Sequence, residues 1–188
     1  MLNDVADASG EPMGGWLLLI YRIPSEPTRL RAAVWRRLKG LGAVYLQNSA
    51  AALPAGAAAE NALRKLCREI IEMGGTAVLM SCGVLVSEAA VLAAFHAARD
   101  DEYEEIIDKC QDFLGQLDKE YKAEHFTYAE LEENEEDLVK LRNWLAKVTD
   151  RDVFGAPKRA ATLEAVATCE HALEEYAARV YAEEAEGD

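Results

Sequence analysis

The chain has 188 residues, of which 51% are hydrophobic, and it carries 20 Lys and Arg against 34 Asp and Glu. The net charge of −14 excludes a surface that coats nucleic acid non-specifically, because most of it would repel phosphates. We expect a cytoplasmic protein, because no apolar run approaches the roughly 20 residues of a membrane helix and no signal-peptide pattern is found.

The charge is divided unevenly along the chain. Residues 1–87 hold 9 basic and 7 acidic side chains, whereas residues 88–188 hold 11 basic and 27 acidic ones. Such a division predicts two units with different roles. We therefore expect a flexible tail over residues 1–13, a first domain over 14–87 and an acidic helical bundle over 88–188.

The first domain is expected to begin with a strand and a helix. Residues 16–23 are a continuous apolar run ended by Pro24, which is typical of a buried strand. A helix is predicted from about residue 29 to residue 39, with Thr28 as its cap.

Two short strands over 44–47 and 51–53 are then predicted, followed by a helix over 58–73 and a strand over 76–86 with a bulge near Gly83. This order indicates a ferredoxin-like βαββαβ domain, in which two helices cover one face of an antiparallel sheet. Together with the helices that follow, the expected fold class is α+β.

The second half reads as helix almost throughout. A first short helix is expected to be interrupted near residues 100–101, and Thr127 and Glu130 form a capping box at the start of a later helix. Pro157 precedes the last helix. The stripe predicted to be buried on that last helix is Leu163, Val166, Cys169, Leu173, Tyr176 and Val180.

The clearest candidate site is the basic side of the first helix. Trp35 lies four residues from both Arg31 and Lys39, opposite the apolar stripe, and Arg37 at the stripe's border is expected to snorkel or to form an internal ion pair. The candidate anion- or DNA-binding residues are Arg22, Arg29, Arg31, Trp35, Arg36 and Lys39. Two interpretations remain open: the bundle or a second subunit covers this side, or it binds a phosphate or an oxyanion.

Other chemistry-bearing residues favour structural interpretations. Cysteines on apolar helix faces are typical of packed, reduced thiols, although a composite metal site from Cys110, His125, Cys169 or His171 is geometrically possible. The acidic run over 130–137 is expected to be a solvated helix face. We expect no metal and no cofactor.

The loop over 150–157 is expected to be an ordered link between helices, with Arg151 and Asp152 tying its ends. No nucleophile with a base and no Gly-rich phosphate loop is found, so nothing in the sequence points to an enzyme.

Several segments carry a resemblance to a known family. They are WLLLIYRIP, PTRLRAAVWRRLKGLGAV, FHAARDDEY, FTYAELEENEEDLVKLRNWLAKV and RDVFGAPKR. They resemble the N-terminal domain of the chromate-resistance protein ChrB, over nearly everything from Trp16 to the last helix. The resemblance implies a transcriptional regulator of chromate-efflux operons, with chromate as effector and DNA as partner. Residues 16–54 are also loosely similar to the ferredoxin-like dimerisation domain of PaaX-type regulators and Cas2 proteins, which implies a homodimer.

The leading hypothesis is therefore a cytoplasmic sensor that regulates transcription in response to an oxyanion. One alternative is a chromate-related oxidoreductase that uses Cys82, although no partner thiol or cofactor motif accompanies this residue. The other is a non-catalytic module that dimerises through its sheet or through Trp35.

Overall fold

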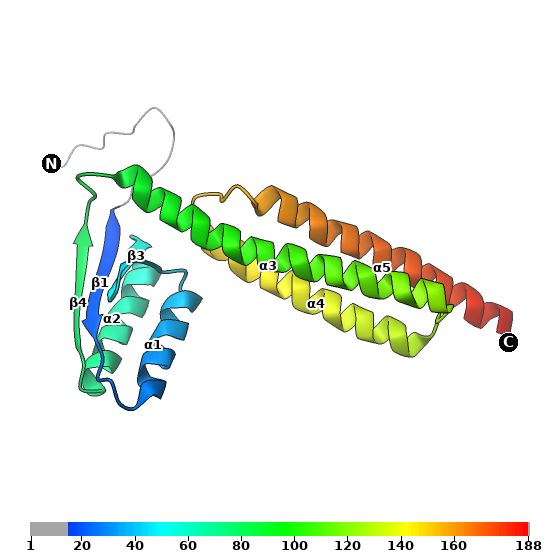
Figure 1. Cartoon of the computed structure of the whole chain (residues 1–188), viewed down its shortest axis with the longest axis horizontal. Coiled ribbons are helices and arrows are strands. Elements are labelled where there is room, and N and C mark those ends of the chain that lie inside the picture. The colour runs from blue at the N-terminus through cyan, green and yellow to red at the C-terminus, as the bar shows by residue number, and fades with distance from the viewer. Residues whose placement is uncertain (1–14, 188) are drawn as a thin grey trace. The chain divides into compact units, whose positions relative to one another are not determined.

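The computed structural model describes residues 15–187 and shows an α+β protein (Figure 1). The chain divides into two compact units, one ending at Ala94 and one beginning at Phe95. The tail expected over residues 1–13 lies outside the described residues. The elements of the first unit are β1 (Trp16–Arg22), α1 (Thr28–Gly40), β2 (Val44–Gln47), β3 (Ala50–Pro54), α2 (Ala57–Glu72) and β4 (Thr76–Cys82).

The four strands form one sheet in the order β2-β3-β1-β4, and all neighbouring strands are antiparallel. Both helices of the unit lie on the same face of this sheet (Figure 1). Leu17 and Leu19 of β1 point to that face and pack with Val34 and Leu38 of α1. α2 contributes Leu63, Leu66 and Ile70 to the same core.

The other face of the sheet is also apolar. Side chains alternate between faces along a strand, so Leu18 and Ile20 of β1 lie opposite the helix-covered side. They pair across the sheet with Met80 and Val78 of β4. Ile20, Val78 and Met80 are exposed, which leaves an apolar strip along β1 and β4.

Two predicted boundaries in this unit are wrong. Pro27, not Thr28, occupies the N-cap of α1, and no side chain caps this helix. β4 ends at Cys82 rather than at residue 86, because Cys82 pairs with Trp16, where β1 begins. No strand continues beyond that pair to extend the ladder, so the bulge expected near Gly83 does not occur within a strand.

The second unit consists of α4 (Tyr128–Arg151), α5 (Arg159–Gly187) and most of α3 (Glu88–Ala123). The interruption expected at residues 100–101 is wrong, since α3 is continuous. Asp100 accepts a hydrogen bond from the backbone N–H of Lys158 at 2.8 Å. Its carboxylate therefore serves the start of α5 and does not compete for the backbone of α3.

The buried positions on all three helices recur at intervals of three and four residues, which is the spacing of helix bundles. Leu163, predicted to be buried on α5, is 46% exposed, and Thr162 lies in the core instead. Thr162 tolerates burial because its hydroxyl donates to the carbonyl of Lys158 at 2.8 Å. The rest of the stripe predicted for α5 is buried as expected.

The cap predicted for α4 is confirmed, because the hydroxyl of Thr127 accepts a hydrogen bond from the backbone N–H of Glu130. Among residues 15–187, no helix combines the length and the hydropathy that a membrane crossing requires.

Candidate functional site

The basic side of α1 is exposed in the first unit. α1 buries Val34 and Leu38 against the sheet, and its remaining face carries two rows of basic residues. One row, at four-residue spacing, is Arg31, Trp35 and Lys39; the other, at seven-residue spacing, is Arg29 and Arg36. All five side chains of these rows are exposed, and so is Arg22 at the end of β1.

The basic residues of this side have no acidic partners among residues 15–94. Arg31 donates to the backbone carbonyl of Ser25 at 3.2 Å, and the ammonium group of Lys39 lies 5.6 Å from the ring centroid of Trp35. Within residues 15–94, no carboxylate pairs with Arg22, Arg29, Arg31, Arg36 or Lys39. Arg37 differs, since it forms the predicted internal ion pair, with Glu69 of α2 at 2.6 Å.

A hollow of about 730 Å³, here called the α1 hollow, opens beside the first row. Its walls are the end of β1 (residues 21–23), Arg31 and Trp35 of α1, and the β2–β3 hairpin (residues 45–49). The antiparallel pairing of β1 with β3 brings the hairpin next to the end of β1. The backbone N–H of Tyr21 donates to the carbonyl of Ser49 at 3.0 Å, which fixes the hairpin there.

Two tyrosines line the hollow and are hydrogen-bonded to each other. The hydroxyl groups of Tyr21 and Tyr45 lie 2.7 Å apart. Burial, together with the hydrogen bond to Tyr21, raises the pKa of Tyr45 well above its usual value. The phenol of Tyr45 therefore contributes a neutral polar group to the hollow at physiological pH.

The structure thus separates the six candidate residues into two groups. Arg22, Arg31 and Trp35 line the α1 hollow, whereas Arg29, Arg36 and Lys39 are exposed outside its walls. The tyrosines and the hairpin were missed by sequence reasoning. Their place in the site depends on strand pairing between distant segments, for which the local pattern contains no signal.

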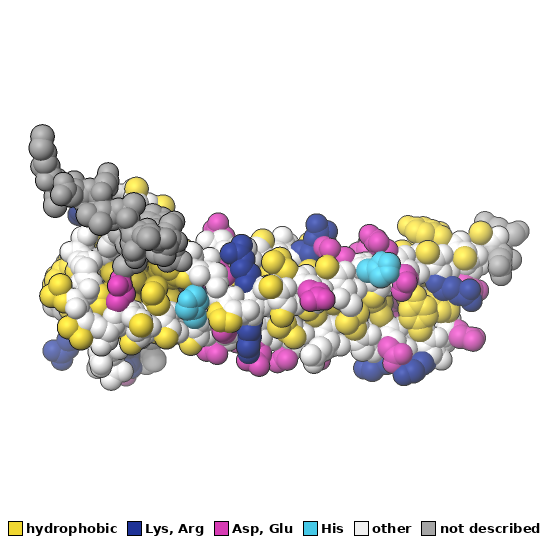
Figure 2. Space-filling view, turned by 90° about the horizontal axis from the view of Figure 1, so that it is seen from above, with side chains coloured by type: hydrophobic (Ala, Val, Ile, Leu, Met, Phe, Trp, Pro, Cys, Tyr) yellow, Lys and Arg dark blue, Asp and Glu magenta, His cyan; other side chains and the backbone are white. Residues whose placement is uncertain are grey.

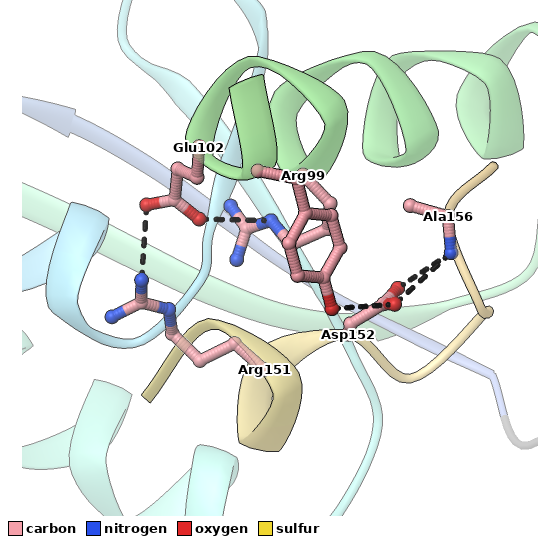
Figure 3. A network of polar contacts seen from close by, with 6 residues as sticks. Arg99, Glu102, Arg151, Asp152 and Ala156 are labelled. Carbon is pink, nitrogen blue, oxygen red and sulfur yellow. Dashed lines mark hydrogen bonds and ion pairs between the residues drawn. The ribbon is translucent and has the colours of Figure 1, made fainter. Parts of the chain in front are cut away.

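A second polar cluster lies in the helical unit and is buried (Figure 3). Glu102 lies between two guanidinium groups, at 3.3 Å from Nε of Arg99 and 3.0 Å from Nη2 of Arg151. Arg99 is only 5% exposed and Glu102 only 6% exposed. Burial lowers the pKa of Arg99, and the negative charge of Glu102 opposes that effect.

Asp152 completes this cluster at the link between α4 and α5. Its carboxylate accepts hydrogen bonds from the backbone N–H of Ala156 and from the hydroxyl of Tyr103, both at 3.0 Å. Asp152 therefore ties this loop as predicted, whereas Arg151 pairs with Glu102 of α3. Arg99 and Glu102 were missed, although both fall near the spacing of the buried stripe of α3, and charged residues at such positions signal internal pairing.

The cysteines and histidines do not form the composite site that the sequence left open. The thiol of Cys169 lies 3.6 Å from the carbonyl of Cys110 in the core, whereas His125 and His171 are exposed. Burial raises the pKa of Cys169 to about 12, so its thiol stays neutral. In the described part of the chain, no group of three or more His, Cys, Asp or Glu could hold a metal ion.

Cys82, the residue considered for redox chemistry, is half-buried at the end of β4.

The acidic run on α4 is a solvated face, as expected. Glu132, Glu133 and Glu135 are exposed, and Lys140 pairs with Asp137 at 2.8 Å. On the face of the helical unit drawn in Figure 2, acidic and basic side chains lie interspersed. Interspersed charges of both signs are typical of a solvent-exposed surface that resists aggregation.

Comparison with curated proteins gives no match. The family model described as "Protein ChrB, N-terminal" matches residues 31–187, which is most of the chain. The match contains Arg31, Trp35, Arg36 and Lys39, whereas Arg22 and Arg29 precede it. The chain therefore belongs to the family of the N-terminal region of ChrB, and it is a chromate-resistance-related protein.

Proposed function

We propose that this chain is a cytoplasmic regulatory protein that controls transcription in response to chromate, through anion contacts on the basic side of α1. The observation that carries the proposal is the exposure of Arg31, Arg36 and Lys39, none of which pairs with a carboxylate among residues 15–94. Residues 15–94 hold 9 basic side chains against 5 acidic ones, so cations outnumber carboxylates in this part of a chain whose net charge is −14.

The chemistry of the side chains supports anion binding. A guanidinium group presents a planar fork of N–H donors that matches the oxygens of a phosphate or of a tetrahedral dianion such as chromate. Positive charge concentrated on the face of α1 would contact a few phosphates, whereas the acidic surface of the helical unit would be repelled by them. DNA binding of this kind is local and strongly salt-dependent.

The strand order supports the finer fold assignment that we propose, a ferredoxin-like domain over residues 14–87 followed by a helical domain over 88–188. In a βαββαβ chain, the order β2-β3-β1-β4 places both crossover helices on one face. On the opposite face, Ile20, Val78 and Met80 stay exposed.

The test is binding of the duplex DNA upstream of the gene itself, with and without chromate, at two salt concentrations. We expect tight binding at low salt, weakened by chromate. The double variant Arg31→Ala/Arg36→Ala should reduce the slope of log affinity against log salt by about two, because two phosphate contacts are lost.

The matched control is Lys65→Ala/Arg68→Ala, which removes two exposed cations from α2 in the same unit. If the α1 and α2 variants lose affinity equally, the basic side of α1 is not the DNA contact. If the wild-type chain shows no salt-sensitive binding, transcriptional control through this side is excluded.

The open apolar face of the sheet favours a second candidate, a dimerisation module. Ile20 is 44% exposed and its partner Val78 is 55% exposed, so a second copy would remove both from water. Light scattering should give the mass of a dimer for the wild type and of a monomer for Ile20→Glu. Identical monomers in both samples would exclude this candidate.

A further inference from the structure

We infer that the α1 hollow binds a nucleotide, meaning a planar base joined to a phosphate, either free or as an unpaired unit of a single strand. The inference rests on the proposed function for the anion-binding side of α1, but it does not depend on transcriptional control. It assigns nucleotide binding to the residues that line the hollow, and it leaves the basic residues outside the hollow to contacts with duplex phosphates.

The size of the hollow is the first argument. Its volume of about 730 Å³ lies within the range of about 300–1,000 Å³ that small-molecule sites occupy. A single tetrahedral oxyanion needs only a few convergent donors, and it would leave most of this volume to water. The ligand that fits is larger than chromate or phosphate and includes an apolar part.

The charge of the walls is the second argument. Arg22 and Arg31 reach the hollow from different elements, the end of β1 and the second turn of α1. No Asp or Glu lies among the residues that line it in the described part of the chain. The two guanidinium groups can therefore bind a phosphate from two directions without displacing an existing ion pair.

The aromatic lining is the third argument. Trp35 is 50% exposed and Tyr45 is 37% exposed, and the contact on the Trp35 ring is the ammonium group of Lys39, 5.6 Å from its centroid. An inorganic anion gains nothing from an indole face, whereas a nucleobase stacks on it favourably. The joint presence of unpaired guanidinium groups and open rings matches a ligand that is anionic at one end and planar at the other.

The hairpin supplies polar groups for the edge of a base. Gln47 and Asn48 are exposed on this wall, and each side chain can both donate and accept hydrogen bonds. A base stacked on Trp35 would turn its edge toward such groups, as unpaired bases do in single-strand sites. A base inside a duplex cannot reach the hollow, so the expected ligand is unpaired.

The experiment is a calorimetric titration of the full chain with four probes. They are adenosine 5′-monophosphate, a single-stranded oligonucleotide of ten deoxyadenosines, ribose 5-phosphate and inorganic phosphate. We expect a probe with a base to bind more tightly than ribose 5-phosphate and inorganic phosphate. If the oligonucleotide binds but the mononucleotide does not, the ligand is a single strand. If both bind, a single nucleotide unit is sufficient for binding.

Variants within α1 identify the hollow as the binding site. Trp35→Ala should weaken binding of the base-containing probe by about 5- to 150-fold, the loss expected for one stacked base. Trp35→Phe, which keeps a ring, should restore most of the affinity. Arg31→Ala should also weaken binding, whereas Arg36→Ala, a matched change outside the hollow, should not.

The inference is overturned if both base-containing probes bind no better than ribose 5-phosphate, or if Trp35→Ala binds them like the wild type. Its failure can be told from that of the proposed function. Nucleotide binding without salt-sensitive duplex binding removes transcriptional control alone, whereas duplex binding without a preference for bases removes the nucleotide site alone.

Discussion

Arg31 and Arg151 carry the same guanidinium group, but the two units place them in opposite surroundings. Arg151 is paired with a buried carboxylate of another helix, whereas Arg31 is exposed and bonded only to a backbone carbonyl. The charges in the core of the helical unit are paired with one another, although Nε and Nη1 of Arg99 and Nε of Arg151 make no hydrogen bond. Removing one charge of such a buried pair leaves the other uncompensated, so its loss should affect the fold. The charges on α1 are exposed, so we expect their loss to affect binding of the proposed ligands and to leave the fold intact.

The largest effect is expected from Glu102→Ala in the helical unit. The substitution leaves Arg99 and Arg151 without their shared carboxylate, and an uncompensated buried charge costs about 3–5 kcal/mol. Urea unfolding should show this loss as a lower free energy of unfolding. The control is Glu104→Ala, whose exposed pair with Lys158 should contribute much less. Equal losses in the two variants would mean that the cluster is not closed to water.

Asp152→Ala is expected to have the next largest effect. It leaves the buried N–H of Ala156 and the hydroxyl of Tyr103 without acceptors, at a cost of about 2–3 kcal/mol. The free energy of unfolding measures this cost, with Asp150→Ala, at an exposed neighbouring position, as the control. A wild-type free energy of unfolding for Asp152→Ala would contradict the role assigned to this loop.

Thr127→Ala should destabilise the helical unit by about 1 kcal/mol, because it removes the side-chain cap of α4. Thr168→Ala is the matched control, since that hydroxyl only bonds back to the carbonyl of Glu164 within α5. Thermal and urea unfolding compare the two variants. A loss confined to Thr168→Ala would show that the cap contributes nothing.

The smallest effect on stability is expected on α1. Arg31→Ala and Arg36→Ala should each change the free energy of unfolding by no more than about 0.5 kcal/mol, because neither side chain is buried or ion-paired in its unit. Arg37→Ala serves as the contrast, since it leaves the half-buried Glu69 without a partner. Should Arg31→Ala unfold the protein, the contrast between the exposed arginines of α1 and the ion-paired arginines of the helical unit would not hold.

Much of the fold could be predicted because it follows from local patterns. The apolar run at residues 16–23, the two helices of the first unit and the cap at Thr127 are each read from a few adjacent residues. Errors arose where a distant segment decided the outcome. β4 stops where its partner strand begins, and α3 continues through Asp100, whose carboxylate accepts a hydrogen bond from the start of α5.

The candidate site shows the same division. The sequence alone determined which side of α1 is basic and exposed, because the 3.6-residue period of a helix assigns each residue to a face. Only the tertiary structure decided that Arg31 and Trp35 share a hollow with Tyr45 and that Glu102 is enclosed by two arginines. A helical period relates residues within one element, whereas a hollow or a buried ion cluster is made by elements that meet only when the chain folds.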